Sequence, residues 1–249
     1  MVLCAALLLY PAKTLFRDDF YTYTEREWAY ADWKLGRTQF GLKPECRNGV
    51  MILRHETYNP KAPGETFLGT ELYTKPNFTL ETGLQITAKV RVKNPPPGMV
   101  ASIFTYSTDK LGSDEIDFEF LTTQTNKAKG DHPVLVTNWN DWDEKKELYG
   151  NKINHSPETV TPKGLNTADW NMYTIRWYPD HTDWLVNGTL VRTSKDAVPN
   201  APTPIRFNFW AAAKSWTEAY SAEYQPTADP SKNQVCTYEI DYVEVKRLP

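Results

Sequence analysis

The sequence predicts an all-β protein folded as a jelly-roll sandwich of two antiparallel sheets. Short runs of alternating apolar and polar residues follow one another along the 249-residue chain, separated by turn-rich pieces. No segment sustains the 3.6-residue period of an amphipathic helix. Aromatic residues make up 13% of the chain, and 18 prolines against 12 glycines suit many strands joined by rigid turns. More than ten strands without helices favour two sheets packed face to face.

The first half of the chain supplies five of these strands. The pattern is clearest where an apolar residue stands at every second position from Leu84 to Val92. Proline-rich segments at 59–64 and 93–98 are expected to be loops. The predicted strands, chosen for their β-branched and aromatic content, are 14–20, 50–55, 71–74, 82–92 and 99–106.

The second half supplies six more strands by the same criteria. Asn187 and Gly188 form the dipeptide that is typical of a tight hairpin turn, so the run around them is expected to fold back on itself. Trp177 and Trp184 alternate with apolar residues and are expected in the core. The predicted strands are 114–121, 134–138, 172–177, 183–191, 205–210 and 237–245.

One of these strands carries three acids on a single face. Glu115, Asp117 and Glu119 alternate with apolar residues at 116, 118 and 120, and no Lys or Arg stands between them. Like charges on one strand face raise at least one carboxyl pKa. Two carboxyl groups with separated pKa values, one protonated and one ionised, are what glycoside hydrolysis needs. A solvated acidic surface is the alternative interpretation.

The spacing of the acids is compatible with this chemistry. The Cα atoms of Glu115 and Glu119 should lie about 13 Å apart along a strand, and two facing Glu side chains can close most of that gap. Retention of configuration needs roughly 5–5.5 Å between carboxyls, whereas inversion needs roughly 6.5–9.5 Å. Asp117 stands between the two and could hydrogen-bond either one.

The segment 115–121, Glu-Ile-Asp-Phe-Glu-Phe-Leu, resembles the active-site strand of glycoside hydrolase family 16. Its form without a β-bulge is that of lichenases and xyloglucan endotransglycosylases. The similarity extends over residues 14–247 and includes the strand before the acids, the paired later strands and the distal cleft wall, at 98–107, 170–177, 184–188, 208–210 and 216.

The resemblance implies a lectin-like jelly roll with a concave substrate cleft, and a retaining endo-β-glucan hydrolase. It implies that Glu115 is the nucleophile and Glu119 the general acid and base, while Asp117 orients Glu115 and keeps the two titrations apart. No cofactor is expected in the chemistry. Mixed-linkage β-1,3-1,4-glucan is the first choice of polysaccharide, and transglycosylation onto β-glucan or xyloglucan is the alternative. A non-catalytic lectin on the same fold is the alternative from another class, although a lectin has no use for clustered carboxylates.

Several residues are predicted to bind the polysaccharide. Trp139 and Trp142 stand in a polar stretch that begins at Asn138, where core burial is awkward and where indole faces could stack on sugar rings. Tyr106 could face either the cleft or the surface. The resemblance adds four positions that match the family's substrate contacts and cleft wall, namely Glu71, Asn208, Trp210 and Trp216. Tyr73 stands where lichenases commonly have Arg.

A structural calcium ion is a separate implication of the resemblance. Many relatives hold Ca²⁺ with two backbone carbonyls and one carboxylate from the final strand. Asp241 fits the carboxylate position, with Gly49 and Asp19 as carbonyl donors. Oxygen ligands suit this hard cation. A surface Asp on a strand is the alternative.

The net charge and the composition of the chain exclude further classes of protein. A net charge of −3 without any basic run argues against nucleic acid, and no apolar run reaches membrane length. Residues 1–249 are expected to form one domain and to act as a monomer, outside the cell or in a periplasm. Residues 1–13 are either an extra strand or a signal remnant. The four histidines are expected at the surface, and the three cysteines are compatible with free thiols or with one disulfide.

Overall fold

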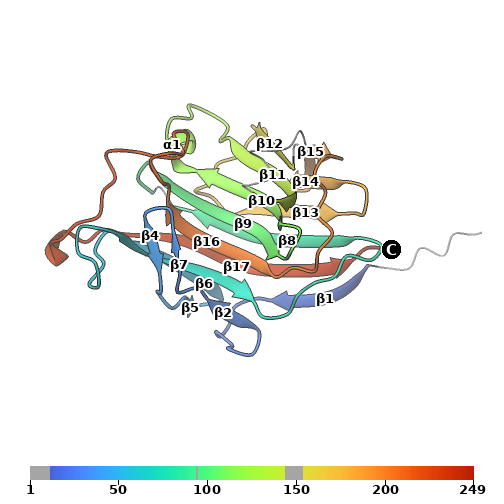
Figure 1. The fold of residues 1–249 in the computed structure, drawn as a ribbon, viewed down its shortest axis with the longest axis horizontal. Helices are drawn as coiled ribbons and strands as arrows, with labels where there is room; N and C mark the ends of the chain where they lie inside the picture. The colour runs from blue at the N-terminus through green and yellow to red at the C-terminus, as the bar shows by residue number, and fades with distance from the viewer. Residues whose placement is uncertain (1–11, 94, 144–153) are drawn as a thin grey trace, which may run out of the picture.

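One strand, β7, links the two sheets of a sandwich in the computed structural model, which describes residues 12–93, 95–143 and 154–249 (Figure 1). The beginning of β7 (Phe67–Thr74) pairs with β6 of one sheet, while its later residues pair with β16 of the other. The short strand β4 (Thr38–Phe40), itself paired with β3 (Lys34–Leu35), runs parallel to the beginning of β7. The predicted all-β jelly-roll class is confirmed.

We call the sheet that contains the three acids the cleft sheet. Its strands pair antiparallel throughout. In spatial order they are β2 (Trp28–Tyr30), β7, β16 (Ile205–Ala211), β9 (Met99–Thr108), β10 (Ser113–Leu121), β11 (Val134–Trp142) and β12 (His155–Val160).

We call the other layer the back sheet. Its long final strand β17 (Val235–Arg247) lies between β8 on one side and β1 and β6 on the other. The remaining strands are β1 (Lys13–Asp18), β5 (Glu45–Arg47), β6 (Val50–Glu56), β8 (Leu84–Val92), β13 (Asn171–Trp177), β14 (Thr182–Val186) and β15 (Thr189–Ser194).

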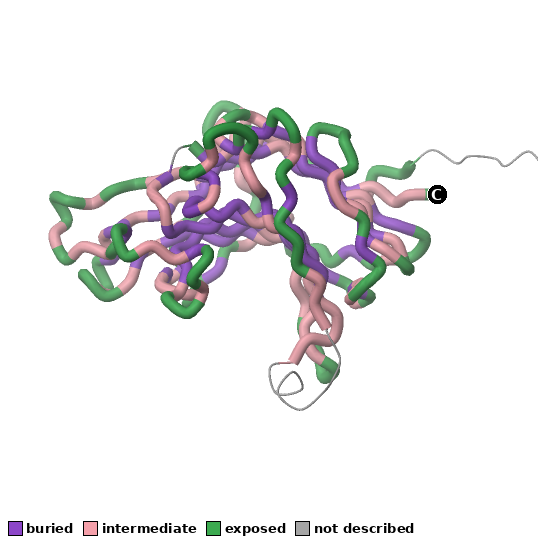
Figure 2. The backbone as a smooth tube through the Cα atoms, turned by 90° about the horizontal axis from the view of Figure 1, so that it is seen from above, coloured by how far each residue is buried: buried purple, intermediate pink, exposed green. Residues whose placement is uncertain are grey.

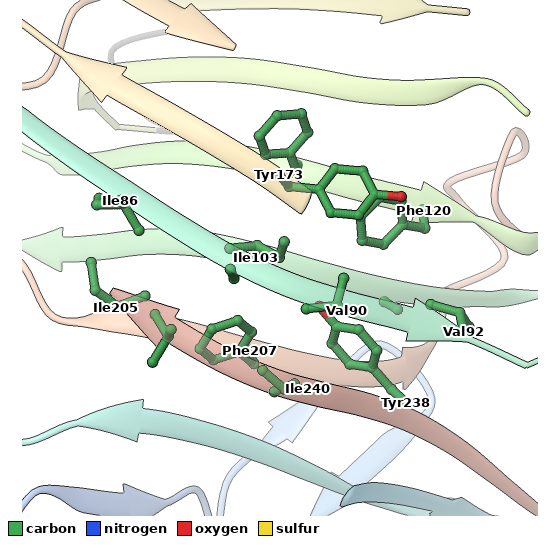
Figure 3. Close-up of a cluster of buried hydrophobic side chains, with 14 of the residues drawn as sticks. Ile86, Val90, Val92, Ile103, Phe120, Tyr173, Ile205, Phe207, Tyr238 and Ile240 are labelled. Carbon is green, nitrogen blue, oxygen red and sulfur yellow. The ribbon is translucent and has the colours of Figure 1, made fainter. Parts of the chain in front are cut away.

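The core lies between the two sheets and is built by alternate residues of both (Figure 3). Burial is concentrated on the strands, and the exposed segments are mainly their connections (Figure 2). Trp177 and Trp184 are fully buried, as predicted. The Nε1 of Trp184 on the back sheet donates to the main-chain oxygen of Asp117 on the cleft sheet at 2.9 Å, and this bond ties the acidic strand to the layer behind it.

One predicted turn is confirmed, whereas several short elements are not among the predictions. Asn187 and Gly188 do form the hairpin turn, with φ angles of 49° and 81°, between β14 and β15. The short strands β2 to β5 and the polar β12 carry too little alternating apolar sequence to be predicted. A single helical turn, α1 (Thr122–Thr125), follows β10, and a 3₁₀ turn, η1 (Pro230–Lys232), precedes β17.

The prediction that all four histidines lie at the surface is wrong for His55. Its ring is fully buried and hydrogen-bonds Thr38 Oγ1 at 2.9 Å and the Tyr224 hydroxyl at 3.1 Å. Apolar neighbours at 51 and 53 hold β6 in the core, and the two hydroxyl partners supply the polar contacts that a buried imidazole requires. Burial lowers the pKa of His55 to about 3.

Two further predictions concern the N-terminal residues and the pairing of the cysteines. Residues 1–11 of the predicted first strand or signal remnant, and Cys4 within them, lie outside the described residues. Cys46 and Cys236 are free thiols. Within the described parts of the chain, no helix has the length and apolar character needed to cross a bilayer.

The buried His55 predicts a defined acid sensitivity. Between pH 6.5 and about 3 the unfolded state binds a proton at this ring and the folded state does not, so stability is lost as pH falls through that window. His55→Gln keeps a donor and an acceptor but cannot titrate. The stability advantage of wild type over this variant should shrink by roughly 3 kcal/mol between pH 7.5 and pH 4, measured by urea unfolding. An advantage that is constant with pH would contradict the assignment.

Candidate active site

The three acids of β10 lie together on the floor of a cleft. Glu115, Asp117 and Glu119 line a cavity of about 420 Å³, while the residues between them are buried in the core. The register with β9 places Glu115 opposite Tyr106 and Glu119 opposite Ser102, so these side chains share the cleft face. The alternation of β10 therefore aims all three carboxyls at the same space, as predicted.

Asp117 is the most enclosed of the three acids. It is only 2% exposed, and Trp139 Nε1 donates to its Oδ2 at 3.1 Å. Burial and the charges of Glu115 and Glu119 raise the pKa of Asp117 well above its ordinary value. Asp117 is also hydrogen-bonded to Glu115, an interaction that raises the pKa of Asp117 and lowers that of Glu115. This contact therefore favours the proton on Asp117 and the charge on Glu115.

Glu115 and Glu119 are partly open to the cleft. Burial raises the pKa of Glu119 to about 8, and the charge of Glu115 adds to this shift. Burial also raises the pKa of Glu115 to about 7, opposed first by the hydrogen bond from Asp117. Both shifts favour the protonated carboxyl, and the contact with Asp117, which acts on Glu115, favours its ionised form.

The rest of the cleft comes from neighbouring strands and from one loop. Glu71 on β7, Asn208 on β16 and Ser102 on β9 form a row that continues across the sheet to Glu119. Arg206 carries the only positive charge among the described lining residues. The full lining is Trp33, Leu35, Glu71, Ser102, Phe104, Tyr106, Glu115, Asp117, Glu119, Arg206, Asn208 and Trp210.

Four buried polar atoms of this lining have no hydrogen-bond partner within the described protein. They are Ser102 Oγ, Arg206 Nε, Asn208 Oδ1 and Trp210 Nε1. Buried polar groups are normally satisfied, so four orphans around one cavity indicate a polar ligand or bound water. Together with the acids, this arrangement describes a site for a hydroxyl-rich molecule.

A second, smaller cavity adjoins the first across β10. Its volume is about 180 Å³, and it is lined by Tyr106, Ser113, Glu115, Trp139 and Trp142. The two indole rings meet edge to face, with centroids 5.4 Å apart. Aromatic walls next to a reactive carboxyl suit a sugar ring.

A comparison with protein-family models decides the family. The model described as "Glycosyl hydrolases family 16" matches residues 65–243. The chain belongs to this family. The resemblance seen in the sequence is therefore confirmed, and with it the class of a glycoside hydrolase.

Curated relatives agree with this assignment. A β-glucanase of Acetivibrio thermocellus is 29% identical over 92% of this chain and 67% of the relative. A β-glucanase of Bacillus licheniformis is 31% identical over 50% of this chain, and the match spans 46% of that relative. This chain therefore spans between about half and two thirds of the length of these two relatives.

Solved structures that share the fold of this chain have a lower sequence identity to it than these curated relatives do. The Bacillus licheniformis β-glucanase superposes with a TM-score of 0.71 at 22% identity, over 96% of this chain and all of the other. An endo-β-1,3-glucanase from Pyrococcus furiosus gives a TM-score of 0.72 at 16% identity, covering 96% of this chain and 95% of the other. These similarities establish the fold.

Most of the residues predicted to bind the polysaccharide do line this family 16 cleft. Glu71, Asn208 and Trp210 lie in the large cavity, Trp139 and Trp142 in the small one, and Tyr106 faces both. The open question about Tyr106 is thereby answered in favour of the cleft.

Two predicted residues lie elsewhere. Asn138 is in register with Ile116 and is fully buried on the core face of β11, where its Nδ2 donates to Asp196 O at 3.2 Å. The period of a strand explains the error, because Trp139 faces the cleft and its neighbour must face away. Trp216 packs against Trp210 at 5.8 Å between ring centroids but is not among the described lining residues.

Trp210 combines a cleft position with a packing role. Its side chain is only 8% exposed and contacts a cluster that includes Phe40, Val100 and Leu121. A Cβ on Gly36, where φ is +54°, would lie 2.7 Å from the indole ring. Trp210 is therefore a buried wall of the cleft and not an open stacking platform.

Sequence reasoning missed five lining residues. Alternation along 205–210 would have placed Arg206 on the same face as Asn208 and Trp210, and alternation along β9 would have given Ser102 and Phe104. Trp33 and Leu35 lie before and within the two-residue strand β3, where the sequence carries no periodic signal.

The structural calcium ion predicted at Asp241, Gly49 and Asp19 stays a prediction. The carboxylate of Asp241 is paired with Lys89 Nζ at 2.7 Å. The main-chain oxygen of Asp19, the predicted donor, lies near Gly49, where an added Cβ would be 3.7 Å from it. The charge that a hard cation would use is already neutralised at Asp241. The described residues contain no group of three or more His, Cys, Asp or Glu placed to hold a metal.

The raised pKa of Glu119 predicts a gain in stability when its charge is removed. From the unfolded value near 4.5 up to about 8, the unfolded state releases a proton that the folded state keeps, so stability falls as pH rises through this window. Glu119→Gln should melt above wild type at pH 9 and together with it at pH 4. Each kcal/mol that the free energy of unfolding gains when the charge is removed should raise the Tm by roughly 2–4 °C.

The exposed Glu223 offers a matched control. Glu223→Gln removes the same charge from the surface and should leave the melting temperature unchanged at both pH values. A Glu119→Gln variant that melts below wild type at pH 9 would contradict the assignment.

Proposed function

We propose that this chain is a retaining endo-β-glucan hydrolase that cleaves β-1,3-1,4-glucan or a related β-linked polysaccharide. The observation that carries this proposal is the ordering of the acids on β10. Glu115, Asp117 and Glu119 face one cavity from alternate positions of the strand, and burial raises the pKa of Glu119 to about 8. Two carboxyls with different protonation states on one cleft floor match the requirements of glycoside hydrolysis.

In the first step Glu115 attacks the anomeric carbon and forms a glycosyl-enzyme ester. Glu119 donates its proton to the departing glycosidic oxygen, so the leaving sugar is released as a neutral alcohol. Asp117 donates a hydrogen bond to Glu115 and holds its carboxylate in place, while Trp139 and the Asp117–Trp184 bond fix Asp117. These two contacts reach Asp117 from β11 and from the back sheet.

In the second step the same groups exchange roles. Glu119, now ionised, removes a proton from water as the water attacks the anomeric carbon, and Glu115 leaves as a carboxylate. Two inversions at one carbon give net retention. The chemistry needs no group beyond these carboxyls and water.

The charge of the cleft favours a neutral polymer. Among the described lining residues, four acids (Glu71, Glu115, Asp117 and Glu119) face one cation, Arg206, which is already paired with Glu71 at 2.8 Å. An anionic polysaccharide would be repelled by this surface, whereas the hydroxyls of a β-glucan would meet its unpaired polar atoms. The β-glucanase relatives support a β-glucan, and the relative named endo-1,3-1,4-β-glycanase, from Rhizobium meliloti, supports the mixed linkage as the first choice.

Transfer to a second sugar is the other candidate outcome. The smaller cavity beside Glu115, with walls formed by Trp139 and Trp142, could hold an acceptor sugar in place of water. Transfer would use the same acids in the same roles.

We also propose that the chain acts as a monomer outside the cell or in a periplasm. The described lining residues of this one chain include all three acids of β10, which supports a monomer. A polymeric substrate is degraded where it occurs, and β-glucans are cell-wall or dietary polymers.

A reducing-sugar assay with barley glucan, lichenan, laminarin, xyloglucan and agarose tests the function. Wild type should act on barley glucan and lichenan, and Glu115→Gln should be inactive while it keeps the fold and the binding of glucan, because Gln is nearly isosteric but not nucleophilic. Chromatography of the products separates hydrolysis from transfer. Normal turnover by Glu115→Gln would remove this residue from the mechanism.

The role of Glu119 predicts a chemical rescue. Glu119→Ala should still form the glycosyl-enzyme from substrates with good leaving groups but should fail to activate water. Added azide needs no general base and should restore turnover with a β-glycosyl azide as product. An α-azide, identified by NMR, would contradict retention.

A further inference from the structure

We propose that Arg192 is a positioning residue, which holds both tryptophans that donate hydrogen bonds to Asp117 and so keeps Asp117 in place beside Glu115. Arg192 lies on β15 of the back sheet and is not among the described lining residues of the cleft. This inference rests on the proposed function, in which Asp117 orients Glu115. It gives a role in the reaction to a residue that lies behind the cleft sheet.

Arg192 joins the two sheets where β15 lies beside β12 (Figure 1). Its side chain is only 8% exposed. Nη1 donates to Val136 O at 2.8 Å and to Ser156 O at 2.7 Å, and Nη2 donates to Ser156 Oγ at 2.7 Å. Nε forms an ion pair with Glu158 Oε2 at 2.9 Å. The guanidinium therefore binds β11 and β12 of the cleft sheet from β15 of the back sheet.

The first path from Arg192 to Asp117 runs through Trp184. Arg192 and Trp184 are register partners on β15 and β14, and the guanidinium carbon lies 5.0 Å from the centroid of the indole ring. A cation above the ring face attracts the negative face of the indole and so stabilises its orientation. The same indole is fully buried, and its Nε1 donates to Asp117 O at 2.9 Å. Arg192 therefore supports the ring whose N–H holds the main chain of Asp117.

The second path runs through β12 and Trp139. Arg192 donates twice to Ser156 on β12. The preceding residue, His155, is the register partner of Trp139, and the two rings are stacked with centroids 4.5 Å apart and planes inclined by 21°. Trp139 Nε1 in turn donates to Asp117 Oδ2 at 3.1 Å. Arg192 thus fixes the strand whose ring packs against Trp139, so the main chain and the carboxyl of Asp117 both depend on one guanidinium.

Closing the edge of the sandwich is the alternative role of Arg192, and the loss of its bonds to buried acceptors costs stability in either case. The positioning role differs because its loss reaches the nucleophile. Contact with Asp117 lowers the pKa of Glu115, so an Asp117 that is less firmly held leaves this pKa higher. The other titratable or charged side chains in the described lining around Glu115 are Glu71, Tyr106, Glu119 and Arg206, from β7, β9, β10 and β16. All of them remain in an Arg192 variant, so the pKa of Glu115 reports on Asp117.

Arg192→Met tests this role, because Met keeps an apolar stem beside the indole but has neither the charge nor the donors. On barley glucan kcat should fall roughly ten- to hundredfold through misplacement of the nucleophile, while KM stays within about threefold of wild type. The acid limb of the kcat/KM profile should move up by roughly half a pH unit to one unit as the contact with Asp117 weakens. In an Asp117→Asn background the same substitution should cost less than about twofold in kcat, because Arg192 acts through Asp117.

Arg37 provides a matched control. Its Nε donates to Ala212 O and its Nη1 to Tyr224 O, each at 2.8 Å, and its guanidinium carbon lies 4.7 Å from the ring centroid of Tyr220. It therefore binds carbonyls and an aromatic ring as Arg192 does, but on the segment 212–224. Arg37→Met should lower the melting temperature as Arg192→Met does and leave the acid limb in place. If Arg192→Met does not fold, Arg192→Lys carries the test, because Lys keeps the charge but lacks the planar fork. Its acid limb should move in the same direction.

Three results would overturn the positioning role. They are a wild-type acid limb in the folded Arg192 variant, an equal shift of the limb in Arg37→Met, and an undiminished loss of kcat in the Asp117→Asn background.

Wild type that cleaves no glucan would instead overturn the proposed function. In that case an NMR titration of isotope-labelled glutamate carboxyls still decides the role of Arg192. The titration of Glu115, assigned by its disappearance in Glu115→Gln, should move to higher pH in Arg192→Met and stay in place in Arg37→Met. A titration of Glu115 that is unchanged in Arg192→Met would overturn the inference without reference to activity.

Discussion

The alternation of β10 is the constraint on which the active site depends. Its apolar residues fill the core while Glu115, Asp117 and Glu119 occupy the cleft. A register slip of one residue would place the acids in the core and the apolar side chains in water, so the core that stabilises the sheet also fixes the acids. The bond from Trp184 to the Asp117 carbonyl anchors this register from the back sheet.

This arrangement of the acids also creates electrostatic repulsion in the cleft. Burial raises the pKa of these acids, and the charge of Glu71 adds to the shift at Glu115 while the charge of Glu115 adds to the shift at Glu119. The fold tolerates this because Asp117 is hydrogen-bonded by Trp139 and because Arg206 neutralises Glu71. Active sites commonly retain such locally unfavourable charges, since the reaction requires them.

Arg206, the one cation among the described lining residues, lies beside the residue that faces it on the neighbouring strand. Tyr73 stands where lichenases commonly have Arg, and its register partner Arg206 brings a guanidinium to the same point from the neighbouring strand. Directly opposite residues on paired strands share a face and lie within about 5.5 Å of each other, so either strand can supply the group.

The sequence by itself determined the fold class, the catalytic strand and the family, because two-residue periodicity is a local property and the acids lie within five positions of one strand. It also indicated that Trp177 and Trp184 belong to the core. Only the tertiary structure decided which aromatic residues are open to the cleft: Trp33 is exposed, Trp210 is enclosed, and Trp216 lies behind Trp210. It likewise buried His55 and paired Asp241 with Lys89. Exposure, ion pairing and pKa depend on residues far apart in the chain, which meet only when the two sheets pack.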